Sequence, residues 1–88
     1  MKYLRIKRIH FDAIRSGEKT TEYRARVPSY RWIESLRAGD EITLMCGSYR
    51  LTISVKTVRV IPTPPEFKES DFARGVAEMY AIDIQRVG

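Results

Sequence analysis

The longest alternation of apolar and polar residues in this chain covers residues 49–61, and it constrains the fold most. Such alternation predicts a β-strand with one face toward the core. The alternation changes phase near Lys56 and Thr57, which predicts a β-bulge or bend. A bulge bends a strand and lets a small sheet curl toward closure. The residues expected to face inward are Leu51, Ile53 and Val55 before the shift, and Val58 and Val60 after it.

Shorter segments with strand periodicity lie on both sides of this strand. Gly17 ends a short helical segment, and Gly47-Ser48 is a two-residue connection typical of a β-hairpin. Five or six short strands with one or two short helices predict a small α+β barrel. The other expected strands are residues 3–8, 20–27, 42–46 and 79–87, and the expected helices or ordered loops are residues 10–16, 30–36 and 66–72.

The chain has 88 residues, which suits one domain spanning residues 1–88. With 43% hydrophobic and 31% charged residues, its composition is typical of a soluble globular domain. We expect no membrane span and no secretory signal. Cys46 is the single cysteine and His10 the single histidine, so we also expect no disulfide, no metal site and no cofactor. These features favour a cytoplasmic protein, and a monomer is favoured although the sequence leaves the oligomeric state open.

The charge is concentrated in one part of the chain. The net charge is +5, and residues 1–37 hold ten basic residues against four acidic ones. Residues 38–88 hold six basic residues against seven acidic ones. A basic half favours a polyanionic partner, because each neutralised phosphate releases counterions. We therefore expect RNA or a nucleoside as the partner.

The segment from Gly17 to Arg24 holds the most informative cluster of polar residues. Glu22 and Arg24 are two apart in a predicted strand, so both point to the same face, and Lys19 can lean over them from the preceding turn. Arginine offers a planar fork of donors, lysine a point charge and glutamate an acceptor, and the edge of a nucleobase can use all three. The alternative is a surface ion-pair network that only pins the strand.

The chain contains four short motifs: Leu4-Arg5-Ile6-Lys7, Phe11-Asp12-Ala13-Ile14, Gly17-x-Lys19-x-x-Glu22-x-Arg24 and Gly39-Asp40. Together these motifs resemble the ASCH domain family, which is similar to PUA domains in fold. The resemblance covers nearly the whole chain and is strongest over residues 3–46. It implies a PUA-like β-barrel with a cleft lined by the Gly-x-Lys-x-x-Glu-x-Arg run, and a role in RNA-linked processes.

One branch of that family, the bacterial acetylcytidine amidohydrolases, has a threonine nucleophile where this chain has Glu22. By this resemblance Lys19 would activate a nucleophile, but the nucleophile itself is replaced, and strand alternation turns Thr21 to the opposite face. A hydrolase of N-acylated pyrimidine nucleosides would then need water activated by Glu22. Another branch is associated with RNA cleavage, which makes a small ribonuclease a further alternative. Candidates for a second acid are Glu66, Glu69 and Asp71.

The leading prediction is a domain that binds RNA or a modified nucleoside, with Lys19 and Glu22 as catalytic residues if it is an enzyme. The surrounding phosphates would be contacted by Arg5, Lys7, Arg26 and Arg31. A protein-interaction module is a second alternative, and it predicts an exposed apolar patch near residues 30–36. The predicted ligand-binding residues are Gly17, Lys19, Thr20, Glu22, Arg24, Arg26, Tyr30 and Arg31.

Three further residues have structural interpretations. Trp32 is expected to cap one end of the barrel, while Tyr30 and Arg31 remain available for stacking on bases. His10 is expected to be a capping or surface residue, and Cys46 is expected to lie in the core.

Overall fold

The computed structural model describes residues 2–67 and 74–86, which form one five-stranded sheet with a short α-helix and two 3-10 helices. No helix in this described part of the chain is both long and apolar enough to cross a bilayer. The elements in chain order are β1 (Lys2–Arg5), α1 (Arg8–Ser16), β2 (Thr21–Ala25), η1 (Pro28–Ser35), β3 (Glu41–Cys46), β4 (Tyr49–Pro62), η2 (Pro65–Phe67) and β5 (Glu78–Arg86).

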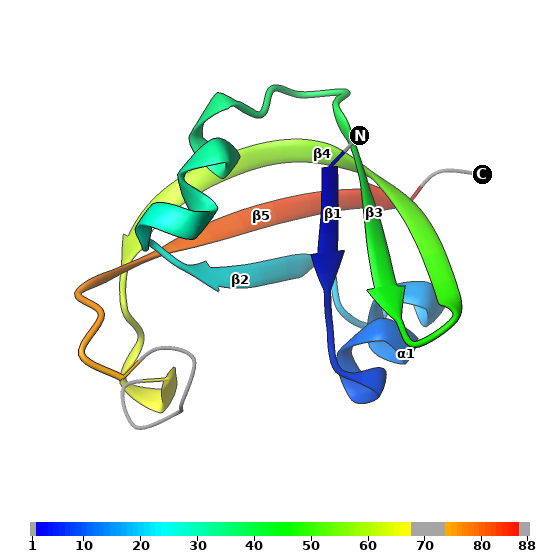
Figure 1. Ribbon diagram of the computed structural model, residues 1–88, viewed down its shortest axis with the longest axis horizontal. Coiled ribbons are helices and arrows are strands. Elements are labelled where there is room, and N and C mark those ends of the chain that lie inside the picture. Colours follow the sequence, from blue (N-terminus) through cyan, green and yellow to red (C-terminus); the bar gives the residue numbers. More distant parts are fainter. Residues whose placement is uncertain (1, 68–73, 87–88) are drawn as a thin grey trace.

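Strand β4 joins the two halves of the sheet. Its first part pairs with β3 and its second part pairs with β5, so the strand order is β1-β3-β4-β5-β2. The register shifts between Val55 and Thr57, which confirms the predicted bulge. Figure 1 shows β1 and β3 crossing the long curved pair of β4 and β5, so the sheet forms a half-barrel. The expected small α+β barrel of five to six strands is therefore confirmed, with five strands and with β1 and β2 at the two edges.

The core fills the inside of this half-barrel. Phe11 and Ile14 of α1 and Ile33 of η1 are buried against the sheet, and Trp32 and Leu36 pack partly on the same cluster. The structural interpretation of Trp32 is thus confirmed. The inward prediction for Val60 is wrong, because this side chain is 46% exposed near the end of β4, beyond the part that pairs with β3. The strands contribute Leu4, Ile42, Leu44, Ile53, Val55, Tyr80, Ile82 and Ile84 to the core.

Local sequence signals place the turns. Gly17 closes α1 with φ 90°, a conformation that side-chain-bearing residues rarely adopt, and its N–H donates to the Ile14 carbonyl at 3.1 Å. The hairpin between β3 and β4 turns at Gly47, where φ is 60°. Cys46, at the end of β3, is a free thiol that packs partly buried against the core, as expected. These turns fix where β2 begins and how far β4 extends.

The Asp83 carboxylate ties three strands together on the outer face of the sheet. It accepts hydrogen bonds from Thr21 Oγ1 at 2.8 Å, from Thr57 Oγ1, and from Arg59 Nε at 3.0 Å. Hydrogen bonds from Arg59, Thr57 and Thr21 favour the ionised form and lower the pKa of Asp83 to about 2. Asp83 therefore links β2, β5 and β4 at the bulge that curls the sheet.

Replacing Asp83 tests this link. Because the folded-state pKa lies below the ordinary value, the ionised carboxylate stabilises the fold above about pH 4, and this contribution is lost as the pH falls toward about 2. Asp83→Asn is expected to lower the free energy of unfolding by about 1 kcal/mol at neutral pH, and the difference from wild type should narrow in acid. Urea unfolding across this pH range measures both effects.

The matched control is Asp12→Asn. Asp12 pairs with Arg8 and Arg15 on the exposed face of α1, so its loss should cost little. Equal effects of the two substitutions at neutral pH would contradict the role given to Asp83.

Candidate functional site

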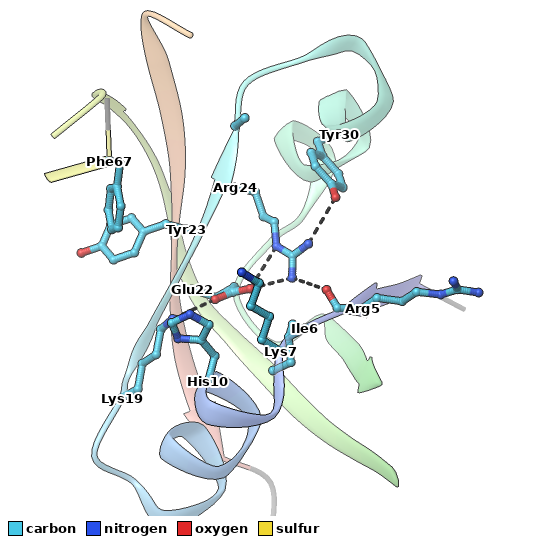
Figure 2. Close-up of a pocket in the computed structure, with 11 residues that line it drawn as sticks. Arg5, Ile6, Lys7, His10, Lys19, Glu22, Tyr23, Arg24, Tyr30 and Phe67 are labelled. Atoms are coloured by element: carbon cyan, nitrogen blue, oxygen red, sulfur yellow. Dashed lines mark hydrogen bonds and ion pairs between the residues drawn. The ribbon is translucent and has the colours of Figure 1, made fainter. Parts of the chain in front are cut away.

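A pocket of about 490 Å³ lies where the half-barrel is open, between the end of β1, the start of α1 and the edge strand β2. Figure 2 shows its side chains converging from these elements, with η1 contributing Tyr30 and η2 contributing Phe67. A volume of this size suits a small organic ligand. The lining residues are Arg5, Ile6, Lys7, His10, Lys19, Glu22, Tyr23, Arg24, Ala25, Tyr30 and Phe67.

Glu22 is the buried acid of the pocket. It is 5% exposed, and both of its carboxylate oxygens have cationic partners. Oε1 lies 3.1 Å from Lys19 Nζ, and Oε2 accepts hydrogen bonds from Arg24 Nε at 2.9 Å and Nη2 at 2.7 Å. A carboxylate is tolerated at such burial only when it is paired in this way. The predicted convergence of Lys19, Glu22 and Arg24 is therefore present in the structure.

Arg24 links three elements through one guanidinium group. Besides Glu22, its Nη2 donates to the Arg5 carbonyl of β1 at 2.7 Å, and its Nη1 donates to the Tyr30 hydroxyl at 3.2 Å. Its side chain is only 13% exposed. These contacts bridge β1, β2 and η1 across the open side of the half-barrel, so Arg24 is mainly committed to holding the pocket together.

Lys19 and His10 form the lower wall of the pocket in Figure 2. Lys19 Nζ lies 3.1 Å from His10 Nδ1, and an ammonium group can only donate, so Nδ1 accepts and the imidazole carries its proton on Nε2. Burial and the neighbouring positive charge of Lys19 lower the pKa of His10. His10 is therefore neutral at physiological pH. The Lys19 side chain is 22% exposed, with one N–H beyond those directed to His10 and Glu22.

Arg5 and Lys7 supply exposed cations at the mouth of the pocket. Arg5 is the last residue of β1 and Lys7 is the N-cap residue of α1, and their side chains form no ion pair within the described part of the chain. Positive charges of this kind remain available to an anionic ligand, unlike the guanidinium of Arg24. The expectation that Arg5 and Lys7 flank the site agrees with where the structure puts them.

The structure does not bring four of the predicted ligand-binding residues into the pocket. Gly17 caps α1, Thr20 precedes β2 and accepts a backbone hydrogen bond from Ile84, and Arg31 is exposed on η1. Arg26 was expected on the face of Glu22 and Arg24, but β2 ends at Ala25. Its guanidinium instead pairs with Glu34 at 3.3 Å and with Glu78 at 3.0 Å.

Five lining residues were not predicted from the sequence, namely Ile6, His10, Tyr23, Ala25 and Phe67. His10 was expected to be a capping or surface residue, and it is indeed exposed, but it also lines the pocket. Its position four residues before buried Ile14 could have indicated a side chain near the core. Tyr23 and Phe67 come from the outer face of the sheet, where their rings lie 5.3 Å apart. No local sequence signal brings Phe67 to β2, because the contact depends on the path of β4 and η2.

The described residues show few of the features expected of a hydrolase, a ribonuclease or a protein-interaction module. Thr21 donates to Asp83 on the outer face, as alternation predicted, and no Ser, Thr or Cys lines the pocket among the described residues. Glu66 does not line the pocket, while Glu69 and Asp71 lie outside the described residues. Within the described ranges no cluster of potential metal ligands is found. The apolar residues of η1 pack on the core and do not form an exposed patch.

Removing the buried acid tests the ion-pair arrangement. Glu22→Gln leaves the charges of Lys19 and Arg24 without their carboxylate partner in a poorly hydrated site. We expect the free energy of unfolding to fall by about 3 kcal/mol. Glu41→Gln, at the exposed start of β3, is the matched control and should change it by less than about 0.5 kcal/mol. If urea denaturation gave similar losses in the free energy of unfolding for both variants, the Glu22 ion pairs would not be what holds the open side of the half-barrel together.

The single histidine allows a direct test of the contact with Lys19. An NMR titration of the His10 ring protons should give a pKa below the ordinary value of about 6.5. Lys19→Met should raise this pKa, because it removes a neighbouring positive charge and leaves Glu22 nearby. Lys56→Met removes an exposed lysine outside the pocket and should leave the pKa unchanged. An unchanged His10 pKa in Lys19→Met would contradict the contact.

No protein-family model matches the chain, and the curated proteins include no match to it. Among solved structures, the chain is similar to the crystal structure of hypothetical protein PH0355, with a TM-score of 0.69. The two sequences are 19% identical, and the alignment covers 99% of this chain and 100% of the other. At this identity the likeness shows a shared fold over the full length of both chains.

Proposed function

We propose that this protein binds RNA or a modified nucleoside in the pocket between β1, α1 and β2. The observation that carries the proposal is the combination, in one pocket, of exposed cations, aromatic rings and a buried carboxylate. The resemblance of residues 3–46 to the ASCH family supports the same function. The proposal includes a monomeric state and a cytoplasmic location. The location suits the free thiol of Cys46, which stays reduced in that compartment.

Different groups of lining residues match different parts of a nucleotide. Arg5, Lys7 and the outward N–H of Lys19 can neutralise phosphate. The rings of Tyr23, Tyr30 and Phe67 provide apolar walls of the kind on which unpaired bases stack, at about 1–3 kcal/mol per base. A purely protein-binding surface does not need this combination of cations and rings around a concave site.

Binding is favoured over hydrolysis by the state of the polar groups. Both oxygens of Glu22 already accept hydrogen bonds or pair with cations, which leaves this carboxylate poorly placed to take a proton from water. The acceptor nitrogen of His10 is occupied by Lys19. We therefore assign these groups to shaping and charging the pocket, and the amidohydrolase and ribonuclease remain alternatives.

The salt dependence of RNA binding tests the proposal. The variant Arg5→Ala/Lys7→Ala removes two rim cations without touching the Glu22 ion pairs. If both contact phosphate, the slope of log K against log salt should become shallower by about 1.4 for single-stranded RNA. Fluorescence anisotropy with a short labelled oligonucleotide over a salt series measures this slope.

The matched control is Arg50→Ala/Lys56→Ala, which removes the same charge from exposed positions on β4 that do not line the pocket. Its slope should stay close to that of the wild type. Equal slopes for the two double variants would show general attraction to a basic protein and would overturn the pocket assignment. Acetylcytidine incubated with the wild type under the same conditions distinguishes turnover from binding.

A further inference from the structure

Strand β2 has one side free of backbone pairing, because it is an edge strand bound to the sheet only through β5. Two backbone hydrogen bonds show which residues direct their N–H and C=O groups toward β5. Arg26 N–H donates to Glu78 O at 3.1 Å, and Ile84 N–H donates to Thr20 O at 2.8 Å. In an antiparallel pair the bonded residues alternate. The even-numbered residues of β2 therefore bond to β5, and the backbone groups of Thr21, Tyr23 and Ala25 point to the free edge.

At the pocket, this leaves one complete donor–acceptor pair on the free edge. The Ala25 carbonyl already accepts from Val27 N–H at 2.9 Å, and Thr21 does not line the pocket. The N–H and C=O of Tyr23 have no hydrogen-bond partner within the described residues. They form an adjacent donor and acceptor that a ligand can satisfy together, as paired residues of neighbouring strands do.

The pocket passes over this edge. Glu22 and Arg24 line it from the inner face of β2, while Tyr23 with Phe67 lines it from the outer face. Figure 2 shows these two pairs on opposite sides of the β2 ribbon. A ligand that fills the pocket from one side to the other must therefore lie against the backbone of Tyr23.

We propose that the main chain of Tyr23 binds the Watson–Crick edge of a nucleobase, with the N–H donating to a base carbonyl and the C=O accepting from a ring N–H. This inference rests on the proposed function and adds how the base is recognised. Uracil and guanine each present a ring N–H beside a carbonyl oxygen, so either base can satisfy both groups at once. The ribose and phosphate would then extend toward Lys7 and Arg5 at the mouth of the pocket.

A nucleobase fits this edge better than an added β-strand. A peptide strand needs several successive backbone pairs, and among the described residues of this edge only Tyr23 offers both groups at the pocket. The guanidinium of Arg24 already occupies the Arg5 carbonyl on the facing strand. The cations at the mouth also favour a phosphate-bearing ligand over a neutral peptide.

Methylated nucleotides test the inference on the wild-type protein. Uridine and guanosine 5′-monophosphates are compared with their 3-methyluridine and 1-methylguanosine counterparts, in which methylation removes the ring N–H. For the base that binds better, we expect methylation to weaken binding at least about tenfold, because one hydrogen bond is lost and the Tyr23 carbonyl is left unpaired. The amide proton of Tyr23 should also shift downfield in NMR spectra when the unmethylated nucleotide binds.

A pair of variants tests the same point from the protein side. Tyr23→Pro removes the backbone N–H at a position where that group faces away from β5, which is where an edge strand tolerates proline. Tyr23→Ala removes the ring but keeps the N–H, so it is the matched control for the lost contact with Phe67. We expect Tyr23→Pro to bind the preferred nucleotide at least about fivefold more weakly than Tyr23→Ala.

The outcomes separate this inference from the proposed function. Equal binding of methylated and unmethylated nucleotides would overturn recognition by the Tyr23 main chain while leaving nucleotide binding in place. Failure of all four nucleotides to bind, together with failure of RNA to bind, would overturn the proposed function and this inference with it. The methylation comparison needs no variant, so it decides the question even if Tyr23→Pro does not fold.

Discussion

The ion pair between Glu22 and Arg24 holds the open side of this fold. Strands β1 and β2 are the edges of the sheet and do not pair, so backbone hydrogen bonds cannot close the barrel there. Arg24 spans the gap by donating to the Arg5 carbonyl and to Tyr30, while Glu22 fixes the orientation of its guanidinium. A side-chain bridge leaves more room than a backbone ladder does. The pocket exists because the barrel is closed in this way.

The same bridge determines which charges remain for a ligand. Glu22 is shared between Lys19 and Arg24, so one negative charge faces two positive charges within the pocket wall. Arg24 has few free donors left, whereas Lys7, Arg5 and part of Lys19 stay available. A buried ion pair contributes little net stability compared with apolar packing, but it fixes geometry. In this protein the ion pair sets the width of the gap between β1 and β2 and the position of the remaining cations.

The sequence allowed prediction of the features that depend on short-range periodicity. The bulge near Thr57, the turn at Gly17 and the shared face of Glu22 and Arg24 all follow from spacing within one segment. Arg26 departed from the pattern because β2 ends at Ala25, two residues before the predicted end of the strand, and because the Arg26 guanidinium pairs with Glu34 and Glu78. Phe67 could not be placed, because its contact with Tyr23 depends on how far the bent strand β4 carries the chain.

Exposed strand edges are normally a hazard, since they can pair with another chain. In β2 the hazard is limited, because the strand has only five residues and charged side chains flank its free edge. The Ala25 carbonyl accepts a hydrogen bond within a local turn. Among the described residues of this edge, Tyr23 is therefore the one at the pocket that keeps both a free donor and a free acceptor. An edge that is too short for strand addition can still bind a flat ligand with adjacent donor and acceptor groups. A ligand bound there would also contact elements on both sides of the gap between β1 and β2. Its binding would therefore increase the stability of the fold that Arg24 holds together.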